Sequence, residues 1–299
     1  MKAKDLAQGK WRTVLSQLGV PAASLDGKHH PCPTTGEGED RFRFSDRNGS
    51  GNFFCACSDG NKGGLALLMC CRNLSYVDAA KEVERVVGGI HPDPPPAQKD
   101  PRIALNRIRK AVKPAGDAVA AYLKGRGLET PPGLRQARLP YWHGGESLGE
   151  FDCMVGLIVS PDGKPQSYHI TYLSEGAKAN VPSPRKVMTP VDTVTGGAIR
   201  LYPPGPHMGI AEGIETAIAA HMLTGIPVWA AANANGVEKF VPPSGCTRIT
   251  VFGDTDESFT GQAAAFTLAR RVSRAGFACE VSLPPEAGDW NDHLLRSTA

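Results

Sequence analysis

The chain lacks a hydrophobic run long enough to cross a membrane. Its longest apolar runs, residues 65–71 and 153–159, fall far short of the roughly 20 residues that a transmembrane helix needs. A secretory signal is also missing, because Trp11, Arg12 and Gln17 interrupt any apolar stretch near the N-terminus. We therefore expect a cytoplasmic protein with no membrane partner.

Strong charge imbalance is absent as well. The 33 Lys and Arg against 30 Asp and Glu give a net charge of +3, too small to indicate nucleic-acid binding by itself. The basic residues are unevenly spread, however, since residues 101–138 contain nine Lys or Arg and only two acids, Asp117 and Glu129. Such a local excess is suited to contacts with phosphates.

A missing motif and the placement of the cysteines limit the possible functions of the chain. The sequence has no G-x-x-x-x-G-K-[ST] motif, so a nucleoside-triphosphate-driven motor of that kind is not expected. Disulfides are not expected in a reducing compartment, yet the chain has eight cysteines. Five of them fall in the first quarter, a clustering that favours metal binding over cross-links: Cys32, Cys55, Cys57, Cys70 and Cys71.

Hydrophobic periodicity and turn residues predict three structured regions. Residues 5–18 read as a helix, residues 40–55 as a hairpin, and residues 65–72 and 76–87 as two short helices. A proline-rich linker follows at residues 89–101. Beyond it, we expect two basic helices within residues 102–126, then a hairpin of strands 153–160 and 166–172.

The last third alternates strands and helices. Strands at 208–211, 227–232, 249–253 and 278–283, with helices at 214–224 and 261–275, predict βαβ units and a small, mostly parallel sheet. The whole chain is thus expected to be a multidomain α+β and α/β protein. We predict domains at 1–88, 102–206 and 207–299, joined by the linker at 89–101.

Carboxylates follow two of the expected parallel strands. Glu212 comes after the first, and Asp254 and Asp256 come after a later one, so all three should meet at one edge of the sheet. Crowded oxygen ligands favour a hard cation such as Mg²⁺, or Mn²⁺ in its place, which suits phosphoryl transfer. The alternative is that Asp254 and Asp256 only cap the next helix. Asp292, in the acidic group at residues 289–292, either completes the metal site or begins the last helix.

These segments resemble the Toprim domain of bacterial-type primases, topoisomerases and some nucleases. The resemblance covers roughly residues 207–296 and rests on residues 209–215, the Asp254 and Asp256 pair with Gly261 after it, and residues 289–292. It implies that Glu212, Asp254 and Asp256 bind catalytic Mg²⁺. Glu212 could instead act as a general acid or base.

The N-terminal region resembles the zinc-binding domain of primase-helicases. The similarity lies in residues 29–33, 40–44 and 48–51, in Cys55 with Cys57, and in residues 63–69. Thr35 stands where the second cysteine of the first pair is usual, and the second pair is one residue tighter than usual. We therefore expect a structural Zn²⁺ site in which a histidine is the fourth ligand.

The predicted zinc ligands leave two alternatives open. Cys32, Cys55 and Cys57 provide three sulfurs, and His29 matches the family's histidine, with His30 as its competitor. Cys70 and Cys71 could intrude, but cysteines on an apolar helix are more often core residues.

The combined resemblance implies a DNA primase of phage or plasmid type without its helicase domain. It would make short RNA primers on a single-stranded DNA template from ribonucleoside triphosphates, with a separate replicative helicase as partner. Lys178 and Arg200 match family positions and are predicted to contact the nucleotide or primer, whereas Arg41 and Arg43 are predicted to contact the template; ordinary solvated charge is the alternative for each. The rival functions are a Toprim nuclease and a zinc-dependent DNA-binding or regulatory protein.

Overall fold

The computed structural model describes residues 2–46, 48–55, 63–90, 100–143 and 145–298. The chain divides into two compact units, residues 1–98 and 99–299. The predicted linker at 89–101 falls largely outside the described residues. No described helix is both long and apolar enough to cross a bilayer.

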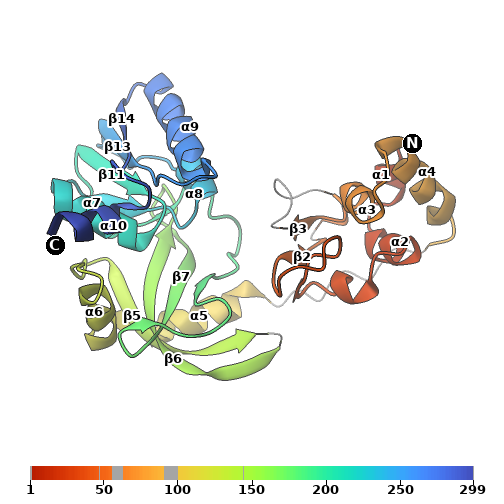
Figure 1. The fold of residues 1–299 in the computed structure, drawn as a ribbon, viewed down its shortest axis with the longest axis horizontal. Helices are drawn as coiled ribbons and strands as arrows, with labels where there is room; N and C mark the ends of the chain where they lie inside the picture. Colours follow the sequence, from red (N-terminus) through yellow and green to blue (C-terminus); the bar gives the residue numbers. More distant parts are fainter. Residues whose placement is uncertain (1, 47, 56–62, 91–99, 144, 299) are drawn as a thin grey trace. The chain divides into compact units, whose positions relative to one another are not determined.

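The first unit packs short helices against a small antiparallel sheet (Figure 1). Its three strands, β1 (His29–His30), β2 (Phe42–Phe44) and β3 (Phe53–Cys55), lie in that order. The expected hairpin is therefore present, with Phe42 opposite Cys55 and Arg43 opposite Phe54. Alternation along β2 buries Phe42 and Phe44 and exposes Arg43.

Helices complete the core of this unit. The helix expected over residues 5–18 is instead two helices, α1 (Ala3–Leu6) and α2 (Trp11–Gln17), because Gly9 adopts a φ of +72° that interrupts the helical path. After the 3₁₀ turn η1 (Ala22–Leu25) and the sheet come α3 (Gly64–Arg72) and α4 (Tyr76–Val87). The Ser75 side chain caps α4 by accepting a hydrogen bond from the Asp78 N–H.

The second unit is built on one continuous sheet. Its strand order is β14-β13-β11-β12-β10-β6-β5-β4, with β7 paired to β6 and the short strands β8 and β9 paired to β7. The strands β11 (His207–Ala211), β12 (Val228–Ala230), β13 (Arg248–Phe252) and β14 (Ala278–Ser282) are parallel, as predicted. Antiparallel β10 (Ala198–Ile199) joins them to the strands of the central region.

The antiparallel part contains the predicted hairpin and more. Strands β6 (Glu146–Val159) and β7 (Pro165–Ser174) pair as expected, and β5 (Leu134–His143), which the pattern did not indicate, pairs with β6. The small strands are β4 (Lys113–Pro114), β8 (Ala177–Lys178) and β9 (Arg185–Val187).

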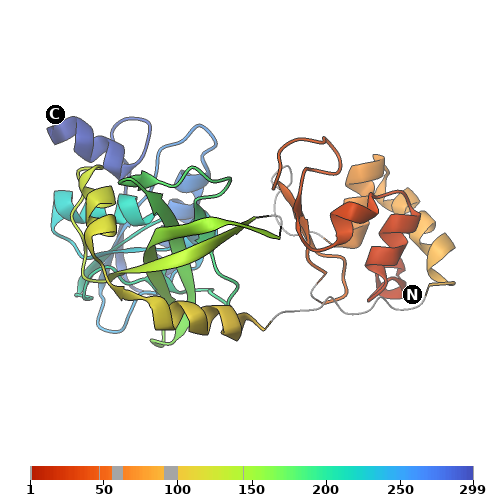
Figure 2. The ribbon, with the colours of Figure 1, turned by 90° about the horizontal axis from the view of Figure 1, so that it is seen from below.

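Helices cover both faces of this sheet. On one face, α7 (Ile214–Thr224) and α10 (Trp290–Thr298) pack together, and α6 (Asp117–Lys124) contributes to the same core. On the other face, α8 (Ala234–Lys239) and α9 (Thr260–Arg274) cover the parallel strands. Helix α5 (Pro101–Ala111) lies along the antiparallel strands (Figure 2).

Candidate active site and zinc site

An acidic edge forms where two neighbouring parallel strands end. Strand β11 ends at Ala211, directly before Glu212, and β13 ends at Phe252, two residues before Asp254. Ala211 and Phe252 are register partners, so the carboxylates that follow them emerge at the same edge.

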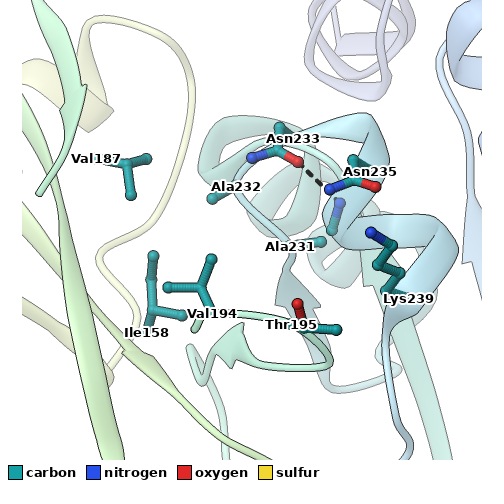
Figure 3. A pocket seen from close by; sticks show the side chains of 10 residues that line it. Ile158, Val187, Val194, Thr195, Ala231, Ala232, Asn233, Asn235 and Lys239 are labelled. Atoms are coloured by element: carbon teal, nitrogen blue, oxygen red, sulfur yellow. Dashed lines mark hydrogen bonds between the residues drawn. The ribbon is translucent and has the colours of Figure 1, made fainter. Parts of the chain in front are cut away.

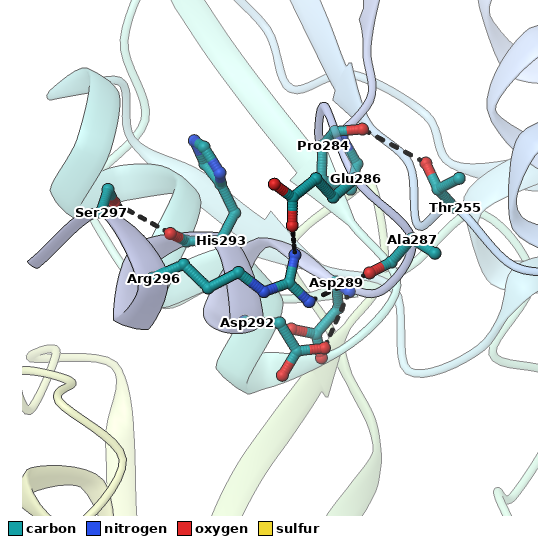
Figure 4. Close-up of polar contacts among 9 residues, drawn as sticks. All are labelled: Thr255, Pro284, Glu286, Ala287, Asp289, Asp292, His293, Arg296 and Ser297. Atoms are coloured by element: carbon teal, nitrogen blue, oxygen red, sulfur yellow. Dashed lines mark hydrogen bonds and ion pairs between the residues drawn. The ribbon is translucent and has the colours of Figure 1, made fainter. Parts of the chain in front are cut away.

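A loop from the C-terminal region joins this edge. Thr255 and Gly288 form an isolated antiparallel bridge, in which the Thr255 N–H donates to the Gly288 carbonyl at 3.0 Å and the reverse bond is 2.9 Å. Gly288 has a φ of +124°, and a Cβ there would lie 2.6 Å from an Asp292 carboxylate oxygen. This bridge brings the acidic group at residues 289–292 towards the strand ends (Figure 4).

Within that group, Asp289 and Asp292 cap the start of α10 reciprocally. The Asp292 N–H donates to Asp289 Oδ1 at 2.9 Å, and the Asp289 N–H donates to Asp292 Oδ2 at 3.2 Å (Figure 4). Arg296 fixes the loop from the helix side by an ion pair of 2.8 Å with Glu286. The hydrogen bonds of Asp292 thus correspond to the second role predicted for it, in which it begins the last helix.

Asp254 lies at the centre of the negative charge. Burial raises its pKa, and the nearby carboxylates raise it further, to about 7; they are Asp289, Glu212, Asp256 and Asp292. Its Oδ1 atom is buried and has no hydrogen-bond partner among the described residues. A buried carboxylate oxygen that the described residues leave without a hydrogen-bond donor is a place where a water or a cation can bind.

The other two acids differ from Asp254 in their surroundings. Burial raises the pKa of Glu212, while the positive charge of Arg185 acts in the opposite direction. Asp256 accepts hydrogen bonds from the Ser258 hydroxyl at 2.5 Å and from the Gly261 N–H at 3.3 Å, and the Ser258 bond lowers its pKa. Asp256 therefore caps the following helix α9, as the alternative reading of the Asp-x-Asp pair predicts. Oδ1 of Asp254 makes no such hydrogen bond within the described residues.

The acidic edge offers the oxygen ligands that a hard divalent cation takes. Among the residues that the structure describes, no three His, Cys, Asp or Glu side chains form a preassembled metal-binding group. Mg²⁺ does not require one, because it usually keeps several waters and binds through one or two carboxylates together with substrate phosphate. The free Oδ1 of Asp254, with Glu212 nearby, supplies that kind of ligand set.

A network of polar side chains, of which Tyr122 and Glu215 are buried, lies near Glu212. Glu215, in the first turn of α7 and three residues after Glu212, is only 4% exposed. It accepts a hydrogen bond of 2.6 Å from the Tyr122 hydroxyl and lies 3.4 Å from Lys178 Nζ. Burial would raise the pKa of Glu215, but the Tyr122 hydrogen bond and the charges of Lys178 and Arg185 lower it overall. The structure thus brings the predicted Lys178 to the helix that follows Glu212.

Three members of this network, Tyr122, Glu215 and Arg185, were not predicted as site residues. Arg185 lies in β9 opposite Thr171, and its charge affects the pKa values of both Glu212 and Glu215. Glu215 follows Glu212 at a spacing of one helical turn, which was the only signal available for it. Tyr122 could not be found from the sequence because it joins from a helix 93 residues away.

Arg200 has a different environment. Its Nη2 donates to the Ser160 carbonyl at 2.8 Å, and its guanidinium lies 4.9 Å from the centre of the Trp229 ring. Trp229 belongs to the core beneath α8 and α9, on the face opposite α7. The described contacts of Arg200 are therefore structural, and its predicted role in nucleotide binding stays a prediction.

Two hollows in the described part of the second unit are relevant to ligand binding. One, of about 50 Å³, lies where β12 ends, between Val194, Thr195 and the residues that open α8; Asn233 caps that helix by accepting from the Gly236 N–H (Figure 3). It is smaller than the roughly 300 Å³ of the smallest usual ligand pockets. The other is a groove of about 290 Å³ between α5 and the strands β5 and β7.

The groove combines aromatic and cationic side chains. Trp142 is 54% exposed, and Arg107 and Lys186 also line the groove. Lys186 Nζ donates to the Trp142 carbonyl at 2.6 Å and lies 3.7 Å from the centre of the Tyr141 ring. Exposed aromatic rings next to cations are the elements with which proteins bind single-stranded nucleic acid.

The predicted zinc site is described only in part. Cys32 and Cys55 are both buried, and their sulfurs lie 3.6 Å apart, whereas Cys57 lies outside the described residues. Burial would raise the pKa of Cys32, but hydrogen bonds from Thr35 and Thr34 lower it to about 6. Thr35, at the position of the missing cysteine, thus contacts the first cysteine.

The two histidines lie on different faces of the sheet. His30 is opposite Phe42, which is in turn opposite Cys55, so His30 shares the cysteine face; its Nε2 is 2.7 Å from Asp26. His29 is opposite Arg43, on the other face, and its Nδ1 donates to the Asp40 carbonyl at 3.1 Å. The structure therefore does not bring His29 together with Cys55.

The predicted template contacts, Arg41 and Arg43, have local partners. Arg41 lies 3.4 Å from Glu37, and Arg43 Nε donates to the Gly27 carbonyl at 3.0 Å. Arg43 points to the exposed face of β2, together with the half-exposed Phe54 opposite it. This arrangement leaves a cation and an aromatic ring on one open face.

Comparison with known protein families assigns three regions. Residues 27–64 match the zinc-binding domain of primase-helicase, residues 98–201 a domain of unknown function, and residues 207–299 the Toprim domain.

Similar solved structures are primases. The primase fragment of the bacteriophage T7 primase-helicase protein is 14% identical, with 90% of this chain and 95% of that chain covered and a TM-score of 0.42. The Aquifex aeolicus primase, comprising zinc-binding and RNA polymerase domains, is 17% identical, with 89% and 74% covered and a TM-score of 0.43.

Domain content is the basis for classification. A zinc-binding domain of the primase-helicase kind precedes a Toprim domain whose acidic edge has the expected strand-end geometry. The chain therefore has the domain composition of a primase-type protein.

Proposed function

We propose that the protein is a DNA primase that joins ribonucleotides into short primers on single-stranded DNA with the help of Mg²⁺ or Mn²⁺. The observation that carries the proposal is Asp254, whose buried Oδ1 has no partner among the described residues while four other carboxylates raise its pKa. A carboxylate whose pKa is raised by neighbouring carboxylates lies in excess negative charge, and such a site is suited to a divalent cation.

The acidic and the basic side chains of the site would bind different groups. Asp254 and Glu212 would hold the metal, which when bound neutralises charge on the reacting phosphate. Lys178 and Arg185 would then bind the triphosphate, since both are cationic and lie near Glu212 or Glu215. Glu215 and Tyr122 are positioning residues, because they hold Lys178 beside α7.

Glu212 fits two roles. Its burial raises its pKa, which suits a general acid or base, and its place at the end of β11 suits a metal ligand. Either role requires the carboxylate, so replacement by glutamine should abolish primer synthesis.

Template binding would involve both units. The groove with Trp142, Arg107 and Lys186 offers stacking and phosphate contacts, and Arg41 and Arg43 offer cations on the zinc-binding domain. A replicative helicase would be the partner that delivers the template, since residues 27–64 match the zinc-binding domain of primase-helicase.

Product analysis tests the proposal against its rivals. The protein is incubated with single-stranded DNA of varied sequence, ribonucleotides and Mg²⁺, and the products are separated by size. Short oligoribonucleotides are expected; cleavage of the DNA without any extension would indicate a Toprim nuclease instead. Binding of DNA with neither reaction would indicate a regulatory protein.

A further inference from the structure

The first unit holds two cysteines outside the region that matches the zinc-binding domain. Cys70 and Cys71 lie near the end of α3, beyond residue 64 where the matched region stops. Thr34, two residues after Cys32, contacts both of them, at 3.4 Å from Cys70 Sγ and 3.7 Å from Cys71 Sγ. The end of α3 therefore lies against the turn that contains Cys32 and the cysteine-free position Thr35.

The distance between the sulfur atoms of Cys32 and Cys55 is suited to zinc binding. A Zn–S bond of about 2.3 Å in a tetrahedral site places two sulfurs about 3.8 Å apart. The separation of Cys32 and Cys55, 3.6 Å, is close to this value. Both thiols are buried, so these two are placed as ligands of one ion would be.

A further zinc ligand is needed, and the position where the zinc-binding domain usually has a second cysteine is occupied by Thr35. Thr35 offers no sulfur, and His29 lies on the opposite face of the sheet from Cys55. His30 is on the correct face, but its Nε2 is bound to Asp26 at 2.7 Å. The cysteines of α3, Cys70 and Cys71, are further sulfur ligands that lie against the turn after Cys32.

The two adjacent cysteines are not equivalent. Neighbouring residues on a helix point about 100° apart, so only one of them faces the core side. Cys70 is exposed, whereas Cys71 is partly buried and packs against the core of the first unit. Cys71 is therefore the candidate of the two.

We propose that Cys71 is a zinc ligand together with Cys32 and Cys55, taking the place of the cysteine that Thr35 has replaced. The described residues contain no preassembled group of three metal-binding side chains, so the Cys71 thiol must turn from Thr34 towards the pair. A cysteine side chain has one torsion with three staggered positions, and metal binding would select the one that faces the ion.

Zinc retention in the full chain tests this assignment. The wild type and the variants C71S, C70S and H29A are purified, and zinc is measured by elemental analysis before and after competition with a chelator. C71S should release zinc to at least about tenfold less chelator than the wild type, whereas C70S and H29A should behave as the wild type does. C55S is the positive control and should lose zinc.

Two additional measurements separate ligation from folding. C71H supplies an imidazole ligand at the same place and should restore retention; a purely structural role of Cys71 would not predict this rescue. Cobalt substituted for zinc should lose part of its sulfur-to-metal absorption in C71S but not in C70S.

Three results would overturn the assignment: zinc retained by C71S as by the wild type, zinc lost by H29A alone, or no zinc in the wild type. None of them bears on primer synthesis by the acidic edge, which is measured separately with Asp254 variants.

Discussion

Asp254 is a partly buried carboxylate whose Oδ1 has no hydrogen-bond partner among the described residues, and four further acids surround it. Its pKa of about 7 lies above its ordinary value, so folding favours the protonated form. The stability that it contributes is present at low pH and is lost as the pH rises through 7, unless a cation binds.

Replacing this residue by asparagine should therefore stabilise the protein while destroying activity. At pH 8 without added divalent metal, we expect D254N to raise the free energy of unfolding of the second unit by on the order of 2 kcal/mol. Urea unfolding measures this. Mg²⁺ should stabilise the wild type but not D254N; equal stabilisation of both would place the ion elsewhere.

His169 is a second buried group with a perturbed pKa. Its Nδ1 has no partner among the described residues, and burial lowers its pKa to about 4, although the charge of Glu215 acts against this. The neutral ring is thus favoured in the folded state. This contribution is complete above the unfolded pKa of about 6.5 and is lost as the pH falls towards 4.

Between pH 7 and pH 5, the wild type should lose about 2 kcal/mol more stability than H169Q, which has no group that titrates there. Chemical denaturation of both proteins at the two pH values gives the difference. Identical pH dependence would show that His169 is not held neutral.

The strand-end acids can be predicted from the sequence because each follows a recognisable apolar strand. Tyr122 and Arg185 cannot, since neither stands near Glu212 in the chain and only folding brings them together. The family pattern favours His29, whereas the pairing of β1 with β2, which places His29 and His30 on opposite faces, depends on a register that the sequence does not reveal.

At the scale of elements, the groove between α5 and the antiparallel strands is the feature that the sequence did not indicate. It needs β5, whose pattern was missed, and the exposed Trp142 near the end of that strand. The helices α4 and α7, by contrast, have the predicted bounds. In the structure the Ser75 side chain caps the start of α4, and Gly225, with a φ of +70°, ends α7.

Replacement of Trp142 tests directly whether the groove binds single-stranded DNA. Loss of one stacked base costs about 1–3 kcal/mol, so W142A should weaken binding of single-stranded DNA by roughly 5- to 150-fold. Fluorescence anisotropy with a labelled oligonucleotide measures the affinity. The matched control is F266A, which removes a ring on α9 that is 56% exposed; an equal loss in both variants would argue against a specific role for the groove.

At the scale of the whole molecule, the contact pattern divides the chain into two units, each with its own core. The central and Toprim regions, predicted as separate domains, share one continuous sheet through β10. Sequence patterns identified the parallel and antiparallel parts but could not show this junction, because β10 has only two residues.

Two units with separate cores should unfold in two thermal transitions. In scanning calorimetry, a zinc chelator should lower the midpoint of the transition of the first unit, and Mg²⁺ should raise only that of the second. One cooperative transition that responds to both metals would contradict this division.

Incorporation of labelled ribonucleotides on single-stranded DNA, compared between the wild type, D254N and D192N, tests the central claim most directly. Asp192 is an exposed acid in the loop between β9 and β10, so its variant has the same chemical change away from the acidic edge. Short RNA products are expected from the wild type and D192N, and at least about a hundredfold less product from D254N. Undiminished synthesis by D254N, or none by the wild type on any template, would contradict the central claim.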